Sequence, residues 1–423
     1  MKKRTYRAVE VKAVDFGRLE EEFKGQRLVF GIDIAKENQY GAIIGNEEET
    51  RLIVKWRHPE ETAELIFKLV GTGARIEAAM EPSGTYGDAI RHQFNANGVK
   101  VYKVSAKRSH DAAEVLDGVP SWHDAKSAVL VGKLHMDGIS SEWAERTETE
   151  RGLVAATKTM AMYDGQAMQN RNRLEAQLAR HWPELGRILE LGSGTMLAVL
   201  EEFGGPGGVA REPERAKALM EREGRRFLSE EKMDLVVASA KATVGVPAIR
   251  EEEEAIRELG RDTRRAEQKA REMRRKVEEL VKGNESAEAM RQTIGIVTAA
   301  VLVARTGDPR EYGSARAFQK SAGLNLKERS SGKHKGELKI TKRGSGEVRM
   351  YLYMAALRLI QDDAVVKAYY EKKVLRDGGK KKVKALVAVM RKLVLGLWHV
   401  ARGEKFDARK LFDTSRLELN KAA

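Results

Sequence analysis

Apolar and polar residues over the first 135 positions alternate in patterns typical first of strands and then of helices. Apolar runs separated by short polar turns predict a three-stranded antiparallel meander at residues 27–34, 39–44 and 51–56. Two more strand-like runs, 76–80 and 99–104, are interleaved with helical spacing at 61–70, 86–97 and 123–135. The order β-β-β-α-β-α-β-α predicts an α/β domain with a mixed five-stranded sheet flanked by helices.

The middle of the chain has a different pattern. Residues 143–184 are poor in glycine, and residues 249–282 are more densely charged still. Both segments predict long exposed helices, paired as an antiparallel coiled coil, although two solvated helices on a globular domain would have the same pattern. Residues 191–246 are punctuated by glycine and predict a helical subdomain at the far end of the pair.

The last third is again mostly helical. Helical spacing covers 290–304, interrupted at Ile294-Gly295-Ile296, and then 314–322, 348–360 and 384–398. A basic loop rich in glycine and serine occupies 327–349. The predicted organisation is an α/β domain at 1–140, a helical pair with its subdomain at 141–286, a helical domain at 287–405 and a tail at 406–423.

Composition narrows the class of function. Lys and Arg number 77 against 63 Asp and Glu, a net charge of +14, and there is no cysteine. A basic excess favours a polyanionic partner, most often nucleic acid, although a merely soluble basic protein would also show it. The lack of cysteine excludes thiol catalysis and cysteine-ligated metals. No apolar run reaches about 18 residues, so the sequence predicts no membrane span and no membrane partner. The lack of cysteine also fits a reducing compartment, and the expected location is the cytoplasm.

Three carboxylates in the first domain are candidate metal ligands. Asp33 sits inside an apolar strand, Glu81 follows the next central strand, and Asp124 opens the helix after the fifth strand. Elements in that order bring such side chains to one edge of a sheet, where a hard divalent cation, Mg²⁺, relieves their repulsion and favours phosphoryl transfer. The alternative is that Asp33 and Glu81 are strand-end residues paired with Lys36 or Lys107.

The same residues carry a family resemblance. Gly31-Ile32-Asp33-Ile34-Ala35-Lys36, then Met80-Glu81-Pro82-Ser83-Gly84-Thr85-Tyr86, resembles the start of the DEDD transposases of the insertion-sequence one-hundred-ten family. The resemblance implies a first domain with the RNase H and Holliday-junction-resolvase fold. It also implies that Asp33, Glu81 and Asp124 are catalytic and bind metal.

The third family motif departs from the family pattern at one position. It resembles the segment 117–128, where the family has two aspartates three residues apart. In one alignment Asp124 takes the third acidic place and Ser127 the fourth; in the other, Asp124 takes the fourth place and Ser121 the third. We prefer the first. In either alignment one carboxylate is missing, which would weaken metal affinity.

The basic loop is a candidate nucleic-acid contact. Residues 327–349 hold eight Lys or Arg and three Glu, a surplus of +5, among small residues that allow phosphates to approach the backbone. A flexible solvated loop is the alternative. The nucleic-acid-binding residues predicted here are Lys333, Lys335, Lys339, Thr341, Lys342, Arg343 and Arg349. Residues 372–384 carry seven further Lys or Arg and one Asp, and form a second candidate phosphate contact.

The loop also resembles the carboxy-terminal domain of the same family. The matching residues are Ala322-Gly323-Leu324, Ser330-Ser331-Gly332 and Ile340-Thr341-Lys342-Arg343-Gly344. The resemblance implies that Ser331, with Ser330 as the fallback, is a nucleophile that forms a phosphoserine bond to DNA. Metal at the three carboxylates could activate it if the two domains meet, for example across a dimer.

The resemblance covers residues 27–402 and implies a function. It implies site-specific DNA strand exchange by a transposase that acts on donor and target DNA, as a homodimer or homotetramer. It also implies guidance by an element-encoded noncoding RNA. Because one carboxylate is missing, two other functions stay open. One is a non-catalytic or metal-impaired nucleic-acid-binding relative, and the other is a structure-specific junction nuclease.

Overall fold

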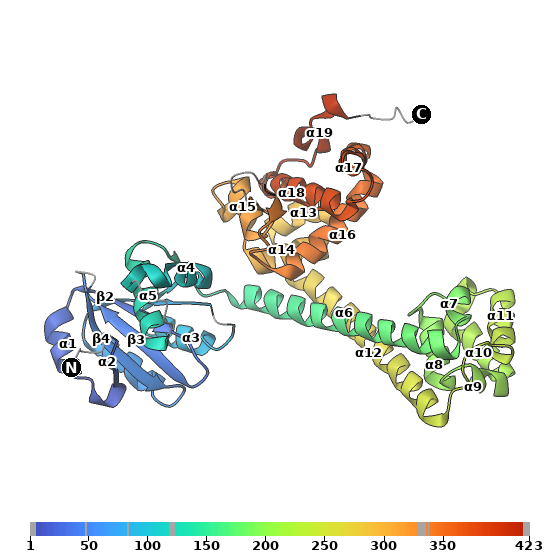
Figure 1. The fold of residues 1–423 in the computed structure, drawn as a ribbon, viewed down its shortest axis with the longest axis horizontal. Coiled ribbons are helices and arrows are strands. Elements are labelled where there is room, and N and C mark those ends of the chain that lie inside the picture. The colour runs from blue at the N-terminus through green and yellow to red at the C-terminus, as the bar shows by residue number, and fades with distance from the viewer. Residues whose placement is uncertain are drawn as a thin grey trace. The chain divides into compact units, whose positions relative to one another are not determined.

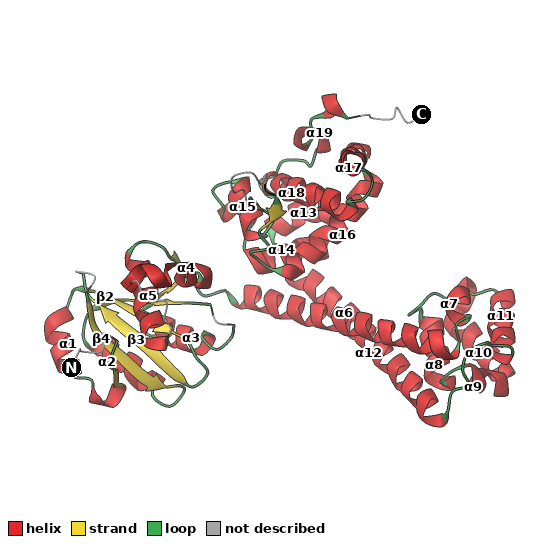
Figure 2. Ribbon diagram, in the orientation of Figure 1, coloured by secondary structure: helices red, strands yellow, loops and turns green. Residues whose placement is uncertain are grey.

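The computed structural model describes residues 6–46, 49–82, 84–117, 123–328, 336 and 338–417. The chain divides into two compact units, Met1–Arg146 and Thr147–Ala423 (Figure 1). Each unit is described by itself. The first contains the sheet, and the second is built almost entirely of helices (Figure 2).

The sheet of the first unit has the strand order β1-β4-β3-β2-β5-β6-β7. Strands β2 (Arg27–Asp33), β3 (Asn38–Ile44) and β4 (Thr50–Arg57) pair antiparallel, which confirms the predicted meander. Strand β5 (Arg75–Met80) pairs in parallel with β2, and β6 (Lys100–Lys103) in parallel with β5. The mixed sheet is therefore confirmed, with β2 and β5 at its centre.

The prediction of five strands was wrong. Strand β1 (Ala8–Glu10) adds to β4 and β7 (Ser141–Glu142) adds to β6, so the sheet has seven strands. Both additions lie at the edges and contain only three and two residues. Segments this short cannot show the alternation of period two that identifies a strand. Backbone pairing offered by the neighbouring strand decides their conformation.

Helices cover both faces of this sheet. The predicted helices are present as α2 (Thr62–Gly71), α3 (Asp88–Ala96) and α5 (Asp124–Met136); α1 (Phe16–Phe23) and α4 (Ala106–Asp117) were not predicted. Phe30 of β2 and Trp56 of β4 pack in one core with residues of α2 and α3. On the other face, residues of β2, β3 and β5 pack with the apolar side of α5.

The second unit begins with two long helices, α6 (Glu148–His181) and α12 (Arg250–Leu280). Ion pairs link Asp164 to Arg274 at 3.2 Å, Arg171 to Glu267, and Arg180 to Glu252 at 3.4 Å. Residue numbers that rise along α6 meet numbers that fall along α12, so the pair is antiparallel, as predicted. Its supercoiling stays a prediction.

Short helices connect the far ends of the long pair. They are α7 (Leu185–Ile188), α8 (Gly194–Phe203), α9 (Pro206–Arg211), α10 (Pro213–Gly224) and α11 (Glu230–Lys241). Their apolar side chains form a separate core with Leu174 and Leu178 of α6, Ile256 of α12, and Trp182. The Trp182 indole is completely buried and donates to the Ser239 hydroxyl at 3.1 Å.

The remaining helices of the second unit form a core of their own with the near ends of α6 and α12. They are α13 (Glu285–Ile294), α14 (Ile296–Thr306), α15 (Ala315–Ser321), α16 (Gly346–Asp362), α17 (Ala364–Arg376), α18 (Lys382–Val400) and α19 (Ala408–Leu411). The break predicted within 290–304 is Gly295, whose positive φ of 77° ends α13. Within the described residues, no helix combines the length and apolarity needed to cross a membrane.

Candidate active site

Asp33 and Glu81 lie at the carboxyl ends of two central strands and on one face of the sheet. Ile32 of β2 pairs with Met80 of β5, so each carboxylate comes one residue after that pair. Side chains alternate between the two faces along a strand. In β2, Phe30 and Ile32 belong to the core under α2 and α3, whereas Val29 packs on the α5 side. Asp33 therefore faces α5, and the same alternation through Ala79 places Glu81 on that face.

Helix α5 crosses β2 very closely, at Gly31 and Gly132. A Cβ atom added to Gly31 would stand 2.4 Å from the Ala128 carbonyl oxygen and 2.5 Å from the Gly132 nitrogen. Only a strand residue without a side chain allows this approach. A Cβ on Gly132 would also stand 2.6 Å from Ile44, which pairs with Val29 of β2, so the earlier residues of α5 lie toward the end of β2. This crossing brings Asp124, the first residue of α5, toward Asp33.

The electrostatics of Asp33 reflect its burial and the charges of the other two carboxylates. Partial burial, together with the negative charges of Asp124 and Glu81, raises the pKa of Asp33 from 3.8 to about 7. Within the described residues, no Lys or Arg forms an ion pair with any of the three, and Lys107 pairs with Asp111 at 2.8 Å. The predicted alternative of strand-end pairing with Lys36 or Lys107 is therefore not observed there.

Local hydrogen bonds hold the surroundings of the carboxylates. The buried Gln39 side chain donates to the Ala35 carbonyl at 2.7 Å and accepts from the Ala35 nitrogen at 3.0 Å, which closes the turn after Asp33. His123 is the N-cap of α5, since its Nδ1 accepts from the Lys126 nitrogen at 3.2 Å. Ser127, the predicted fourth acidic position, is buried, and its hydroxyl donates to the His123 carbonyl at 3.3 Å.

The described residues contain no group of three His, Asp or Glu side chains close enough together to hold a metal ion. The chemistry of the donor set nevertheless suits a hard cation, because it consists of carboxylate oxygens whose repulsion already shifts the pKa of Asp33 upward. The three carboxylates would supply Mg²⁺ ligands only if they drew closer together on binding it.

Sequence reasoning missed two buried polar groups on helix α5, one near each end of the helix. Lys126 follows Asp124 on α5 and is only 1% exposed. His135, near the end of α5, is bonded at Nε2 to Glu77 of β5 at 2.9 Å and at Nδ1 to Ser140 at 2.7 Å. Glu77 also pairs with Arg27, so its pKa is lowered despite partial burial. The only sequence signal was a set of polar residues inside otherwise apolar elements.

In the second unit, the first part of the basic loop lies between the two strands of a small sheet. Strand β8 (Leu326–Lys327) pairs antiparallel with β9 (Lys339–Ile340). The Thr341 hydroxyl donates to Asn325 Oδ1 at 2.6 Å, and the Thr341 nitrogen donates to the Asn325 carbonyl at 2.9 Å. Ser330, Ser331, Lys333 and Lys335 lie outside the described residues. Thr341 therefore closes the base of the loop that carries the predicted nucleophile.

The backbone after Thr341 is tightly constrained. The Lys342 nitrogen donates to the Gly323 carbonyl at 3.1 Å, and Lys342 has a positive φ of 56°. A Cβ atom on Gly344 would stand 2.4 Å from the Ser321 carbonyl oxygen. The Arg349 guanidinium donates to the Gly344 carbonyl at 3.0 Å. This turn fixes the segment that carries Arg343 and Arg349, whereas Lys339 lies in β9.

An ion pair that sequence reasoning did not find anchors helix α16 directly after the loop. Arg305 of α14 donates through Nε to Glu347 of α16 at 2.7 Å, and both side chains are largely buried. Four residues on, the Tyr351 hydroxyl donates to Asp164 of α6 at 3.4 Å. Burial and the Asp164 charge raise the pKa of Tyr351. These bonds connect the start of α16 to the long helical pair.

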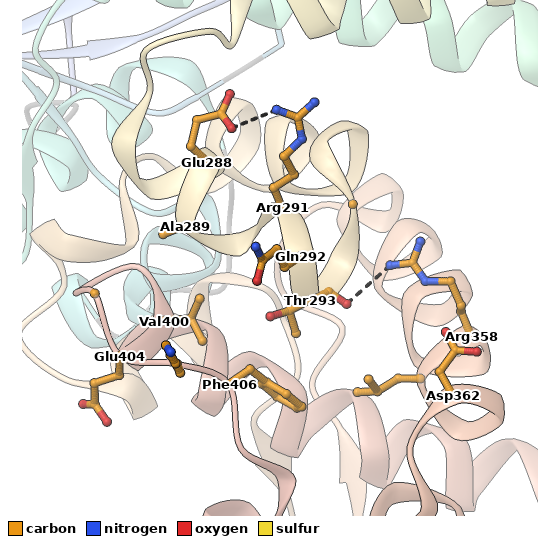
Figure 3. A pocket seen from close by; sticks show the side chains of 14 residues that line it. Glu288, Ala289, Arg291, Gln292, Thr293, Arg358, Asp362, Val400, Glu404 and Phe406 are labelled. Atoms are coloured by element: carbon orange, nitrogen blue, oxygen red, sulfur yellow. Dashed lines mark hydrogen bonds and ion pairs between the residues drawn. The ribbon is translucent and has the colours of Figure 1, made fainter.

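A cleft of about 780 Å³ lies beside the Ile294-Gly295-Ile296 turn, lined by residues of α13, α16 and the segment 400–406 (Figure 3). Arg358 donates to the Thr293 carbonyl at 3.3 Å, and Arg291 pairs with Glu288 at 3.1 Å. Glu404 and Asp362 also line the cleft and add negative charge. Because positive and negative groups alternate around it, the cleft has no clear preference for phosphate.

Comparison with known families gives a match within the second unit. Residues 291–371, from the end of α13 into α17, match the family described as Transposase IS116/IS110/IS902 family. The match supports the identification of the chain as an IS110-family transposase, as the resemblance implied. No curated protein matches the chain significantly. The matched segment includes the basic loop, Thr341 and the start of α16.

Proposed function

We propose that the protein cleaves and rejoins DNA strands at specific sites, with Ser331 as the nucleophile and Asp33, Glu81 and Asp124 as an acidic Mg²⁺ site. The match to a transposase family supports a DNA recombination enzyme with a DNA partner. The observation that carries the acidic site is the pKa of Asp33, raised to about 7 first by partial burial and then by the charges of Asp124 and Glu81.

A raised carboxyl pKa in a partly buried position has a direct consequence for cation binding. Near neutral pH, Asp33 is partly protonated, and a cation that binds the three groups must displace that proton. When bound, Mg²⁺ would supply charge neutralisation and activation of an oxygen nucleophile. Asp33 ends β2, Glu81 directly follows the neighbouring strand β5, and Asp124 begins helix α5, which crosses closely over Gly31.

The acidic site is tested by calorimetric titration of the full chain with Mg²⁺ in buffers of different ionisation enthalpy. We expect binding to release a proton near pH 7, and Asp33→Asn to abolish that release. Asp111→Asn, on the same unit, is the matched control because Asp111 pairs with Lys107. Binding without proton release in the wild type would contradict the role of Asp33.

The Ser331 hydroxyl would form one new oxygen–phosphorus bond with the DNA backbone while one sugar oxygen leaves as the free hydroxyl. The phosphoserine ester conserves the bond energy for rejoining. In incubations of full-length protein with labelled DNA, we expect Ser331→Ala to abolish the covalent protein–DNA adduct, and Ser330→Ala to retain it. An adduct that persists in Ser331→Ala and disappears in Ser330→Ala would reassign the nucleophile to Ser330. One that persists in both would refute the proposal.

Two features of the proposal concern partners. The basic loop and the segment 372–384 provide charge for phosphate contacts, and we propose that a noncoding guide RNA from the element supplies sequence specificity by base pairing. We also propose assembly as a dimer or tetramer. Binding of the full chain to RNA transcribed from the flanks of its own coding region tests the guide, and sedimentation tests the assembly.

A metal-impaired nucleic-acid-binding relative is the second candidate function, favoured by Ser127. Its hydroxyl is buried and already donates to the His123 carbonyl, so it offers a weak metal ligand at best. Ser127→Asp adds the missing carboxylate. If only this variant recombines DNA, the wild type is the impaired relative; if the wild type is active with Mg²⁺, that alternative fails. Cleavage of branched DNA that survives Ser331→Ala would indicate a junction nuclease.

A further inference from the structure

The turn between α17 and α18 concentrates positive charge and exposed apolar side chains. We call residues 372–384 the basic turn. It contains seven cations, Lys372, Lys373, Arg376, Lys380, Lys381, Lys382 and Lys384, with Asp377 as its single acidic residue. The Asp377 carboxylate faces Arg376 Nε at 3.9 Å and Lys384 Nζ at 3.4 Å. One carboxylate thus stands among seven cations.

The cations of the basic turn repel one another. The pKa of Lys373 is lowered, first by partial burial and then by the positive charges of Arg376, Lys372 and Lys384; Asp377 only partly offsets this. The Lys373 ammonium also lies 5.3 Å from the centre of the Tyr369 ring. A lysine whose charge is disfavoured by its neighbours gains from any anion that approaches the group. The turn therefore favours a polyanion over a single counterion.

Apolar side chains in the basic turn face solvent. Leu375 is 74% exposed and Val383 is 63% exposed, whereas Val366 of the same helix α17 is completely buried. Between them, Gly378 and Gly379 have φ of 64° and 79°, and a Cβ added to either would meet no atom within 4 Å. The backbone at these two glycines is therefore open to solvent within the described part of the chain.

We infer that the basic turn binds DNA, with its cations on the phosphates and Leu375 and Val383 against sugars and bases where the duplex is distorted. Proteins that bend DNA combine these two elements, because apolar side chains enter a partly unstacked base step while Lys and Arg hold the backbone. The charge excess matches a polyanion, and the exposed leucine gains only from a partner that also presents an apolar surface. The choice of DNA rests on the proposed function.

The test compares a fully paired short duplex with the same duplex carrying an unpaired bulge, by fluorescence anisotropy with full-length protein. The preference is the ratio of the affinity for the bulged duplex to that for the paired duplex. Leu375→Ala should lower this ratio about tenfold, because most of the apolar contact made by the leucine side chain is lost. Lys380→Gln with Lys382→Gln should lower the slope of log affinity against log salt by about 0.9 for each phosphate that the variant no longer neutralises. Leu235→Ala and Lys232→Gln, both exposed on α11, are matched controls and should change neither quantity.

The outcomes separate this inference from the proposed function. If the variants of the basic turn bind both duplexes like the wild type while the Ser331 adduct still forms, the inference is overturned and the proposed function stands. If they lose binding as expected but the wild type forms no adduct, the inference stands alone. Binding to RNA or to anionic vesicles that the same substitutions abolish, with DNA binding unchanged, would replace DNA as the partner and overturn the inference.

Discussion

Replacing Gly31 by alanine tests whether the close crossing of α5 over β2 builds the acidic site. The added Cβ would stand 2.4 Å from the Ala128 oxygen, 2.5 Å from the Gly132 nitrogen and 2.6 Å from the Gly132 Cα. All three atoms belong to the α5 backbone, so no side-chain rotation can relieve the overlap. Helix α5 must move away from the strand, and Asp124 moves with it.

The expected loss of folding stability follows from the known cost of overpacking in protein cores. Extra methylenes forced into a packed core cost about 1–3 kcal/mol, and contact with rigid backbone places Gly31→Ala at the upper end, at about 3 kcal/mol. Because every 1.4 kcal/mol is a factor of ten, slow-exchanging amides of β2 should exchange about a hundredfold faster. The pKa of Asp33 should also fall below about 7, since the Asp124 charge contributes to it.

Hydrogen exchange followed by mass spectrometry measures both units in one experiment, without assuming that they unfold together. Gly165→Ala is the matched control: Gly165 lies in the interior of α6, and an added Cβ would meet no atom within 4 Å. It should leave β2 unchanged and stabilise α6 by about 0.5–1 kcal/mol. Exchange in β2 that is identical for Gly31→Ala and the wild type would refute the reasoning about this crossing.

Two other predictions concern buried charge. Because the folded-state pKa of Asp33 is raised, the protonated form favours folding, and this contribution to the stability of the first unit is lost as pH rises from about 3.8 to about 7. Asp33→Asn should remove this loss of stability. Asp124→Asn should make it smaller, because the pKa of Asp33 falls, and NMR titration of the carboxyl groups measures that pKa. A pKa of Asp33 that is unchanged in Asp124→Asn would contradict the effect of the Asp124 charge. In the second unit, Arg305→Met leaves the Glu347 carboxylate without its partner and should cost about 3 kcal/mol. Combining Arg305→Met with Glu347→Leu should recover part of that loss of stability. Hydrogen exchange of the amides in α14 and α16 measures the stability of both variants. If the single and the double variant lose the same stability, the unpaired charge is not the cause.

The sequence predicted most of the elements because their apolar patterns are local. The meander, the helices α2, α3 and α5, the break at Gly295 and the long helices α6 and α12 follow from spacing that one segment shows by itself. Strands β1 and β7 and helix α4 escaped prediction. Two or three residues cannot show a period, and 106–117 carries many polar residues that hide its helical spacing.

The sequence predicted only part of the candidate site. The apolar setting of Asp33 and the position of Glu81 after a strand predicted that both lie at the same end of neighbouring strands, and β2 and β5 do pair in parallel. The sequence could not show that Ser127 is turned into its own helix, or that His123 caps α5. Hydrogen bonds of this kind depend on where a side chain finds its partner, which no pattern of residue types records.

The resemblance to a transposase family and the excess of basic over acidic residues could be inferred from the sequence alone, since composition and short motifs do not depend on folding. The pKa of Asp33, in contrast, is decided by the tertiary structure. Burial and two neighbouring charges raise the pKa of Asp33, and those neighbours come from segments about 50 and 90 residues further along the chain. The pairing of β2 with β5 brings Glu81 near, and glycines 31 and 132 bring Asp124 near, because only backbone without side chains allows a helix and a strand to cross so closely.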